Sequence, residues 1–127
     1  MTKNIFISTV HEDSEYIAQL KDWIKNKLLG EVNLVHETQD KRHEGSDAIR
    51  KYIKEKIKDC QVLFVLIGND THNHEWITIE TELANSFHLK IICSRIPNTV
   101  GSPPLILKKY QLVDFKPLDI KNALDMA

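Results

Sequence analysis

The chain has 127 residues, of which 42% are hydrophobic and 28% are charged. These values are typical of one soluble globular domain, so we expect a single domain over residues 1–127. The 17 basic and 18 acidic residues give a formal net charge of -1, which provides no overall attraction to nucleic acid or to an anionic membrane.

The sequence has no signal-peptide layout at its N-terminus and no apolar run long enough to cross a bilayer. We therefore expect a cytoplasmic protein that binds neither membrane nor nucleic acid. Cys60 and Cys93 lack the spacing of a zinc site and adjoin apolar runs, so we expect buried, reduced thiols. The histidines at 36, 43, 72 and 74 are better explained as solvated or capping side chains, and no metal site is predicted.

Strand and helix patterns alternate along the chain. The first half of the chain is predicted to contain a strand at 4–8, a helix from Asp13 or Ser14 to Gly30, a strand at 32–35, a loop at 37–45, and a helix capped by Ser46 and carrying Ile49, Ile53 and Ile57. The second half is predicted to contain a strand at 62–67, a turn at 69–73, a helix at 74–88 and a strand starting at 91–93. A loop at 97–104, a short edge strand at 111–113 and a helix capped by Asp119 complete the chain.

This alternation predicts an α/β fold with helices on both faces of a parallel sheet. Five strands in this length suit a flavodoxin-like three-layer domain with strand order 2-1-3-4-5. In such sheets ligands bind at the carboxyl ends of the strands, where the strand order switches. A ligand-binding site is therefore expected in three segments, 8–13, 37–46 and 68–76.

The helix after the third strand carries one charge on its apolar stripe. Trp76, Leu83, Ala84 and Phe87 form that stripe, and Glu80 lies on it one turn beyond Trp76. A carboxylate on a buried face is costly unless it is satisfied. In one interpretation, Glu80 lies at the edge of the stripe and reaches water or a basic neighbour. In the other, it is held in a cleft for ligand hydroxyls or a developing cation.

Two segments of the sequence resemble TIR-like domains. Residues 4–8, followed by His11-Glu12-Asp13, resemble the opening strand and first helix cap of these domains. The apolar run 62–67, its glycine turn and the W-x-x-x-E segment from Trp76 to Glu80 resemble their third strand and following helix. The similarity spans residues 3–96 and is strongest to the short bacterial TIR-like proteins of Thoeris-type antiphage defence.

This resemblance implies an enzyme that cleaves the nicotinamide–ribose bond of NAD, with NAD as substrate and no cofactor. It makes Glu80 the catalytic residue. One carboxylate suffices chemically, because nicotinamide leaves without a general acid and the oxocarbenium-like state needs only charge stabilisation. The residues predicted to bind the substrate are Phe6, Ser8, Thr9, His11, Arg42, Ser46, Gly68 and Trp76. Core packing for Trp76 and a solvated loop position for Arg42 are the alternatives.

The resemblance also implies partners. The loop from Asp40 to Ser46 matches a mobile loop through which TIR domains commonly self-associate. The product, ADP-ribose or a cyclised form, is expected to act on a separate effector protein. Two alternatives stay open, which are a non-enzymatic TIR-like interaction scaffold and a nucleoside deoxyribosyltransferase-like enzyme acting on a nucleoside.

Overall fold

The computed structural model describes residues 3–8, 15–36, 46–69, 75–101, 103, 105–110 and 112–126. Its strands are β1 (Lys3–Ser8), β2 (Val32–His36), β3 (Val62–Ile67), β4 (Lys90–Arg95) and β5 (Leu112–Asp114). They form one sheet in the order β2-β1-β3-β4-β5, and every neighbouring pair is parallel. All six side chains of the central β3 are buried, which explains its continuous apolar sequence.

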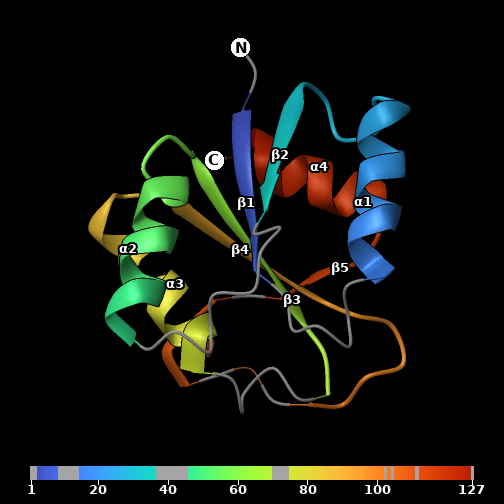
Figure 1. Cartoon of the computed structure of the whole chain (residues 1–127). Helices are drawn as coiled ribbons and strands as arrows, with labels where there is room; N and C mark the ends of the chain where they lie inside the picture. Colours follow the sequence, from blue (N-terminus) through green and yellow to red (C-terminus); the bar gives the residue numbers. More distant parts are fainter. Residues whose placement is uncertain are drawn as a thin grey trace.

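Helices cover both faces of this sheet (Figure 1). The helices are α1 (Glu15–Lys25), α2 (Ser46–Ile57), α3 (Glu75–Ser86) and α4 (Pro117–Asp125), with a short 3-10 helix η4 (Leu105–Leu107) before β5. One half of the core joins α2 and α3 to the sheet, and the other half joins α1 and α4 to its opposite face. The predicted three-layer α/β fold and its strand order are confirmed.

Two helices end earlier than predicted, because a residue other than glycine adopts a left-handed conformation after each. Lys27 has φ 61° after α1, and His88 has φ 62° after α3. In both cases the next amide donates to a carbonyl five residues earlier, Leu28 to Trp23 and Leu89 to Ala84, as in a Schellman motif. The prediction that α1 continues to Gly30 is therefore wrong, and Leu28 is 45% exposed.

The start of α4 also differs from the prediction that Asp119 caps it. Lys116 occupies the N-cap position and makes no side-chain capping hydrogen bond, and Pro117 is the first helical residue. Proline suits this position because its fixed φ is helical and its missing amide has no helical acceptor. Asp119 lies inside the first turn, where its charge is favourable next to the helix N-terminus.

The segment after β4, which the sequence predicts only to be a loop, is hydrogen-bonded to the end of β3 and to Asn69. The amide of Ile96 donates to the carbonyl of Ile67 at 2.9 Å, and the amide of Val100 donates to Asn69 Oδ1 at 2.9 Å. A Cβ on Gly101 would lie 2.4 Å from the carbonyl oxygen of Gly68. The end of β3 and the two residues after it are therefore held by the segment that follows β4.

This packing predicts different costs for two glycine substitutions. Gly101→Ala would place its Cβ against the backbone of Gly68 and Asn69, so we expect a stability loss of about 1–3 kcal/mol. Gly30→Ala meets no atom within 4 Å but has φ +84°, so we expect a loss of about 1 kcal/mol from backbone strain alone. Denaturant unfolding measures both losses. The two causes are distinguished if Gly30→Asn is more stable than Gly30→Ala while Gly101→Asn is no more stable than Gly101→Ala. Higher stability with asparagine at both positions would contradict this explanation.

The two cysteines are free and buried, as predicted. Burial raises the pKa of Cys93 from 9.0 to about 12, and burial together with the charge of Asp59 raises the pKa of Cys60 from 9.0 to about 11. Above pH 9 the thiols of the unfolded chain lose their protons while those of the folded protein keep them, so the free energy of unfolding falls between pH 9 and the folded pKa values.

The burial of Cys60 and Cys93 predicts slow chemical labelling. We expect a thiol reagent at pH 8 to label the folded protein far more slowly than the unfolded chain, and equal rates would contradict this burial.

Candidate functional site

The carboxyl ends of three neighbouring strands form the edge at which a ligand is expected. The sheet register pairs Ser8 of β1 with Val65 of β3, and Ile67 of β3 with Arg95 of β4. Because α3 connects two parallel strands, its N-terminus lies at this same edge (Figure 1). The predicted site residues Thr9, His11 and Arg42 lie outside the described residues, and their roles stay predictions.

Glu80 lies in the second turn of α3 and is 2% exposed. It shares the sheet-facing side of the helix with Ile77, Thr81 and Ala84, which are all buried. Glu82, two residues further along the same helix, is exposed. The interpretation in which Glu80 reaches water at the edge of the stripe is therefore wrong, whereas the one in which it reaches a basic neighbour stays open. Glu80 also takes part in a polar or electrostatic interaction, as the cost of burying a carboxylate requires.

Ser8 is the second buried polar residue at this edge, and it is 1% exposed. Alternate residues of a strand share a face, and Phe6 packs in the half of the core that contains α2 and α3. Ser8 at the end of β1 therefore faces the same layer as Glu80. Its Oγ has no hydrogen-bond partner among the described residues.

The other buried hydroxyls of the described residues are satisfied. Thr81 Oγ1 donates to the carbonyl of Ile77 at 2.8 Å, and Ser94 Oγ donates to the carbonyl of Val113 at 2.8 Å. A buried hydroxyl without a partner costs about 1–3 kcal/mol. Ser8 therefore offers a hydrogen-bonding group that a ligand at the carboxyl edge can satisfy.

The remaining predicted binding residues have different surroundings. Phe6 is 0% exposed and lies within the core, where packing explains it. Gly68 is buried directly after β3, in contact range of Gly101. Ser46 begins α2 and Trp76 is the second residue of α3, but their side chains lie outside what the structure describes. Ligand contacts by Phe6, Ser46 and Trp76 stay predictions.

Arg95 was missed by the sequence reasoning, which examined only three of the loops at this edge. It ends β4 beside the end of β3, is half-buried, and donates from Nη1 to the carbonyl of Thr99 at 3.3 Å. The position of a strand-terminal cation next to the third strand was available from the predicted strand order.

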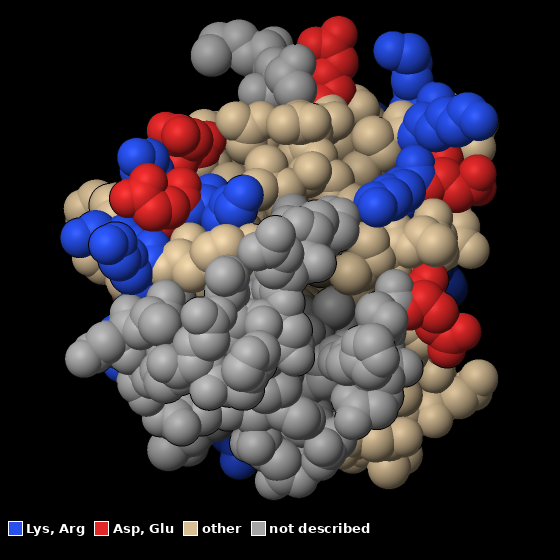
Figure 2. All heavy atoms as spheres, in the orientation of Figure 1, with Lys and Arg blue, Asp and Glu red and all other residues tan. Residues whose placement is uncertain are grey.

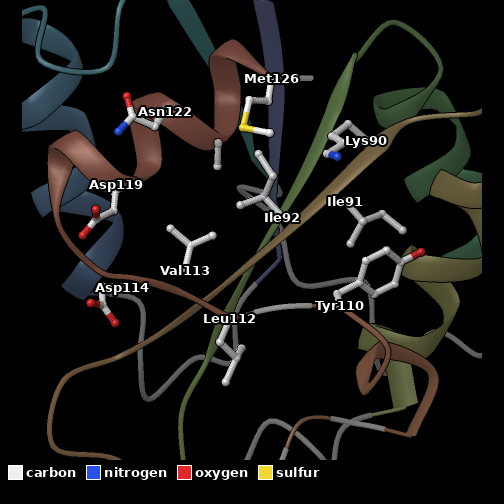
Figure 3. A pocket seen from close by; sticks show the side chains of 11 residues that line it. Lys90, Ile91, Ile92, Tyr110, Leu112, Val113, Asp114, Asp119, Asn122 and Met126 are labelled. Atoms are coloured by element: carbon white, nitrogen blue, oxygen red, sulfur yellow. The ribbon is translucent and has the colours of Figure 1, made fainter.

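A groove of about 590 Å³ lies elsewhere, along the edge of the sheet between β4, β5 and α4 (Figure 3). It exists because β5 pairs only with Cys93–Arg95, so no described residue pairs with the first half of β4 on that side. Asp114 and Asp119 line one end of the groove, and Lys90 lines the other. None of the predicted site residues that the structure describes lines this groove, so it is separate from the carboxyl ends of β1 and β3.

The described residues contain no group of three His, Cys, Asp or Glu side chains arranged to hold a metal ion. Within the same ranges, no helix has the length and apolar character needed to cross a membrane. On the face shown in Figure 2, basic and acidic side chains of the described residues are interspersed around the helices. That face therefore carries no track of a single charge sign over the described residues.

The chain shares its fold with known TIR and SEFIR domains. The TIR domain of the Toll-related receptor TRR-2 from Hydra magnipapillata aligns with a TM-score of 0.60 at 12% identity, covering 96% of this chain and 95% of that one. A prokaryotic SEFIR domain aligns with a TM-score of 0.55 at 18% identity, covering 98% of this chain and 88% of that one. At these identities the likeness concerns the fold alone.

Family membership comes from the sequence itself. No curated protein matches the chain. Residues 6–100 match the family model of the TIR-like domain of the Thoeris protein ThsB. This match includes the second half of the opening strand, the segment after β3 and the helix that carries Glu80. The chain therefore belongs to the ThsB TIR-like family of Thoeris antiphage defence.

Proposed function

We propose that this protein is an NAD-consuming enzyme that cleaves the nicotinamide–ribose bond, with Glu80 as its catalytic carboxylate. The observation that carries the proposal is the burial of Glu80, 2% exposed, on the face of α3 that packs toward the sheet. A solvated glutamate on a helix needs no functional explanation, whereas a buried one does. Membership of a TIR-like family makes NAD the substrate considered first.

The chemistry requires little besides a well-placed negative charge. When the bond between C1′ of the ribose and the pyridinium nitrogen breaks, its electron pair moves to that nitrogen and nicotinamide leaves as a neutral molecule. The ribose develops oxocarbenium character, which an adjacent carboxylate stabilises. A buried carboxylate does this better than an exposed one, because a low local dielectric strengthens the attraction. Water or another acceptor then attacks C1′ to give ADP-ribose or a cyclised form.

Ser8 is proposed as a substrate contact beside Glu80. Its hydroxyl is buried on the same side of the sheet and has no partner in the part of the chain that the structure describes. A ribose hydroxyl or the carboxamide of nicotinamide can supply the missing hydrogen bond. Substrate binding would then recover a free energy that the free protein loses at this position.

The cellular setting follows from the proposed reaction. We propose that the enzyme acts in the cytoplasm and that its product acts on a separate effector protein. We also propose self-association through the loop from Asp40 to Ser46, most of which lies outside the described residues.

The catalytic role predicts the effect of replacing the carboxylate by an amide of the same shape. Glu80→Gln should lower the rate of nicotinamide release from NAD on the order of 100-fold or more, because the amide carries no negative charge. Glu82→Gln is the matched control, since Glu82 is exposed on the same helix and its replacement should leave the rate unchanged. Nicotinamide release by purified protein, measured over a range of concentrations to allow assembly, gives the rates.

Two results would contradict the proposal in different ways. Release that survives Glu80→Gln, in a variant whose unfolding transition matches that of the unchanged protein, would remove Glu80 from the mechanism. No release by the unchanged protein at any concentration, including with extract from phage-infected cells, would overturn the enzyme and leave the interaction scaffold.

The buried hydroxyls of Ser8 and Ser94 should affect the free energy of unfolding in opposite directions. Ser8→Ala should leave the free energy of unfolding unchanged or raise it by about 1 kcal/mol, because it removes a desolvated group that has no partner. Ser94→Ala should lower it by about 1 kcal/mol, because the carbonyl of Val113 loses its donor. Only Ser8→Ala should also raise the KM for NAD. A destabilised Ser8→Ala with an unchanged KM would show that this hydroxyl is structural.

A further inference from the structure

We propose that Arg95 forms a phosphate subsite that binds the diphosphate of the substrate at the carboxyl end of β4. The inference rests on the proposed function for the identity of the ligand, a dinucleotide with a diphosphate bridge. The structure supplies the position of the Arg95 guanidinium, its unused N–H donors and the segment that orients it.

The position of Arg95 follows from the sheet register. Cys93 of β4 and Ile67 of β3 both pack in the half of the core that contains α2 and α3. Arg95 lies two residues after Cys93 and pairs with Ile67, so it belongs to the same face of the sheet. Ser8 and Glu80 face this layer too. The cation therefore ends a strand on the side of the sheet where the proposed ribose site lies.

Most N–H donors of the Arg95 guanidinium are not used by the described residues. A guanidinium carries five N–H groups, and Arg95 commits one of its nitrogens, Nη1, to the carbonyl of Thr99 at 3.3 Å. Among the described residues no carboxylate forms an ion pair with it, and the ion pairs found there join Lys58 to Glu55 and Lys121 to Asp125. Asp114 of β5 is the cross-strand neighbour of Arg95, but the two form no ion pair, so the half-buried guanidinium keeps donors suited to bidentate binding of a phosphate.

The segment that orients Arg95 is itself fixed. Thr99 Oγ1 donates to the carbonyl of Ile96 at 2.6 Å, and the neighbouring amide of Val100 donates to Asn69 Oδ1 at 2.9 Å. Asn69 follows Gly68 in the turn that leads toward α3. The carbonyl that holds Arg95 is therefore next to an amide that is tied to the residue two positions after β3. This arrangement fixes the guanidinium against the end of β3 before a ligand binds.

The chemistry of the site indicates which anion it takes. A ribose held at Glu80 carries its diphosphate on C5′, a few bonds from the carbon that reacts. The N-terminus of α3 at this edge adds partial positive charge, so an anion there meets two favourable groups. Arg95 thereby supplies binding at a distance from the reacting bond, and its loss should act on affinity more than on the chemical step.

The test compares ligands with and without a diphosphate. ADP-ribose binding is measured by calorimetry on the full chain for the unchanged protein, Arg95→Gln, Arg95→Lys and Arg50→Gln. Arg50 is an exposed arginine of α2 and serves as the matched control for the loss of one charge. We expect Arg95→Gln to weaken ADP-ribose binding at least tenfold, Arg95→Lys to weaken it less because the charge remains, and Arg50→Gln to have no effect. Binding of nicotinamide riboside, which has no phosphate, should be unchanged in all variants.

The outcomes separate this inference from the proposed function. ADP-ribose binding that depends on Arg95, in a protein that releases no nicotinamide, would support the subsite and overturn the enzyme. Equal ADP-ribose binding by the unchanged protein and Arg95→Gln, or no binding by either, would overturn the subsite even in an active enzyme. Equal weakening of ADP-ribose and nicotinamide riboside would overturn it too, since the effect would then come from a disturbed loop.

Discussion

β3 lies between β1 and β4, and each of its side chains is buried against one of the two helix layers. Its parallel pairing on both sides sets the register of the neighbouring strands, so the ends of β1, β3 and β4 meet at one edge. Both halves of the core pack on this strand. The places of Ser8 and Arg95 at this edge therefore depend on the burial of one apolar hexapeptide.

At that edge, polar groups are set into an otherwise apolar interior. Glu80 and Ser8 are buried, and Arg95 is half-buried at the end of β4 on the same side of the sheet. Elsewhere in the described core, Thr81 and Ser94 use their hydroxyls within the fold. A carboxylate and an unpaired hydroxyl are costly to bury, which is the usual sign of a position held for a function rather than for stability.

The three residues differ in how far the sequence revealed them. Glu80 was identified as the one charge on an apolar helical stripe, but the pattern allowed a solvated position, and only its burial in the structure excludes that. Ser8 was named through resemblance to TIR-like domains, and the missing partner of its hydroxyl is visible only in three dimensions. Arg95 was not named, because a sequence scan sees a cation before a proline-containing loop and not the strand beside it.

The sequence by itself determined the alternation of strands and helices, the parallel sheet and its strand order. Short apolar runs and helical periodicity are local properties, and few topologies accommodate their alternation. It did not determine where α1 and α3 end, since left-handed conformations at Lys27 and His88 are stabilised by hydrogen bonds that close only in the folded chain. Nor did it determine that the segment after β4 is hydrogen-bonded to Ile67 and Asn69. That contact joins segments about thirty positions apart, and its donors and acceptors meet only because β3 and β4 are paired.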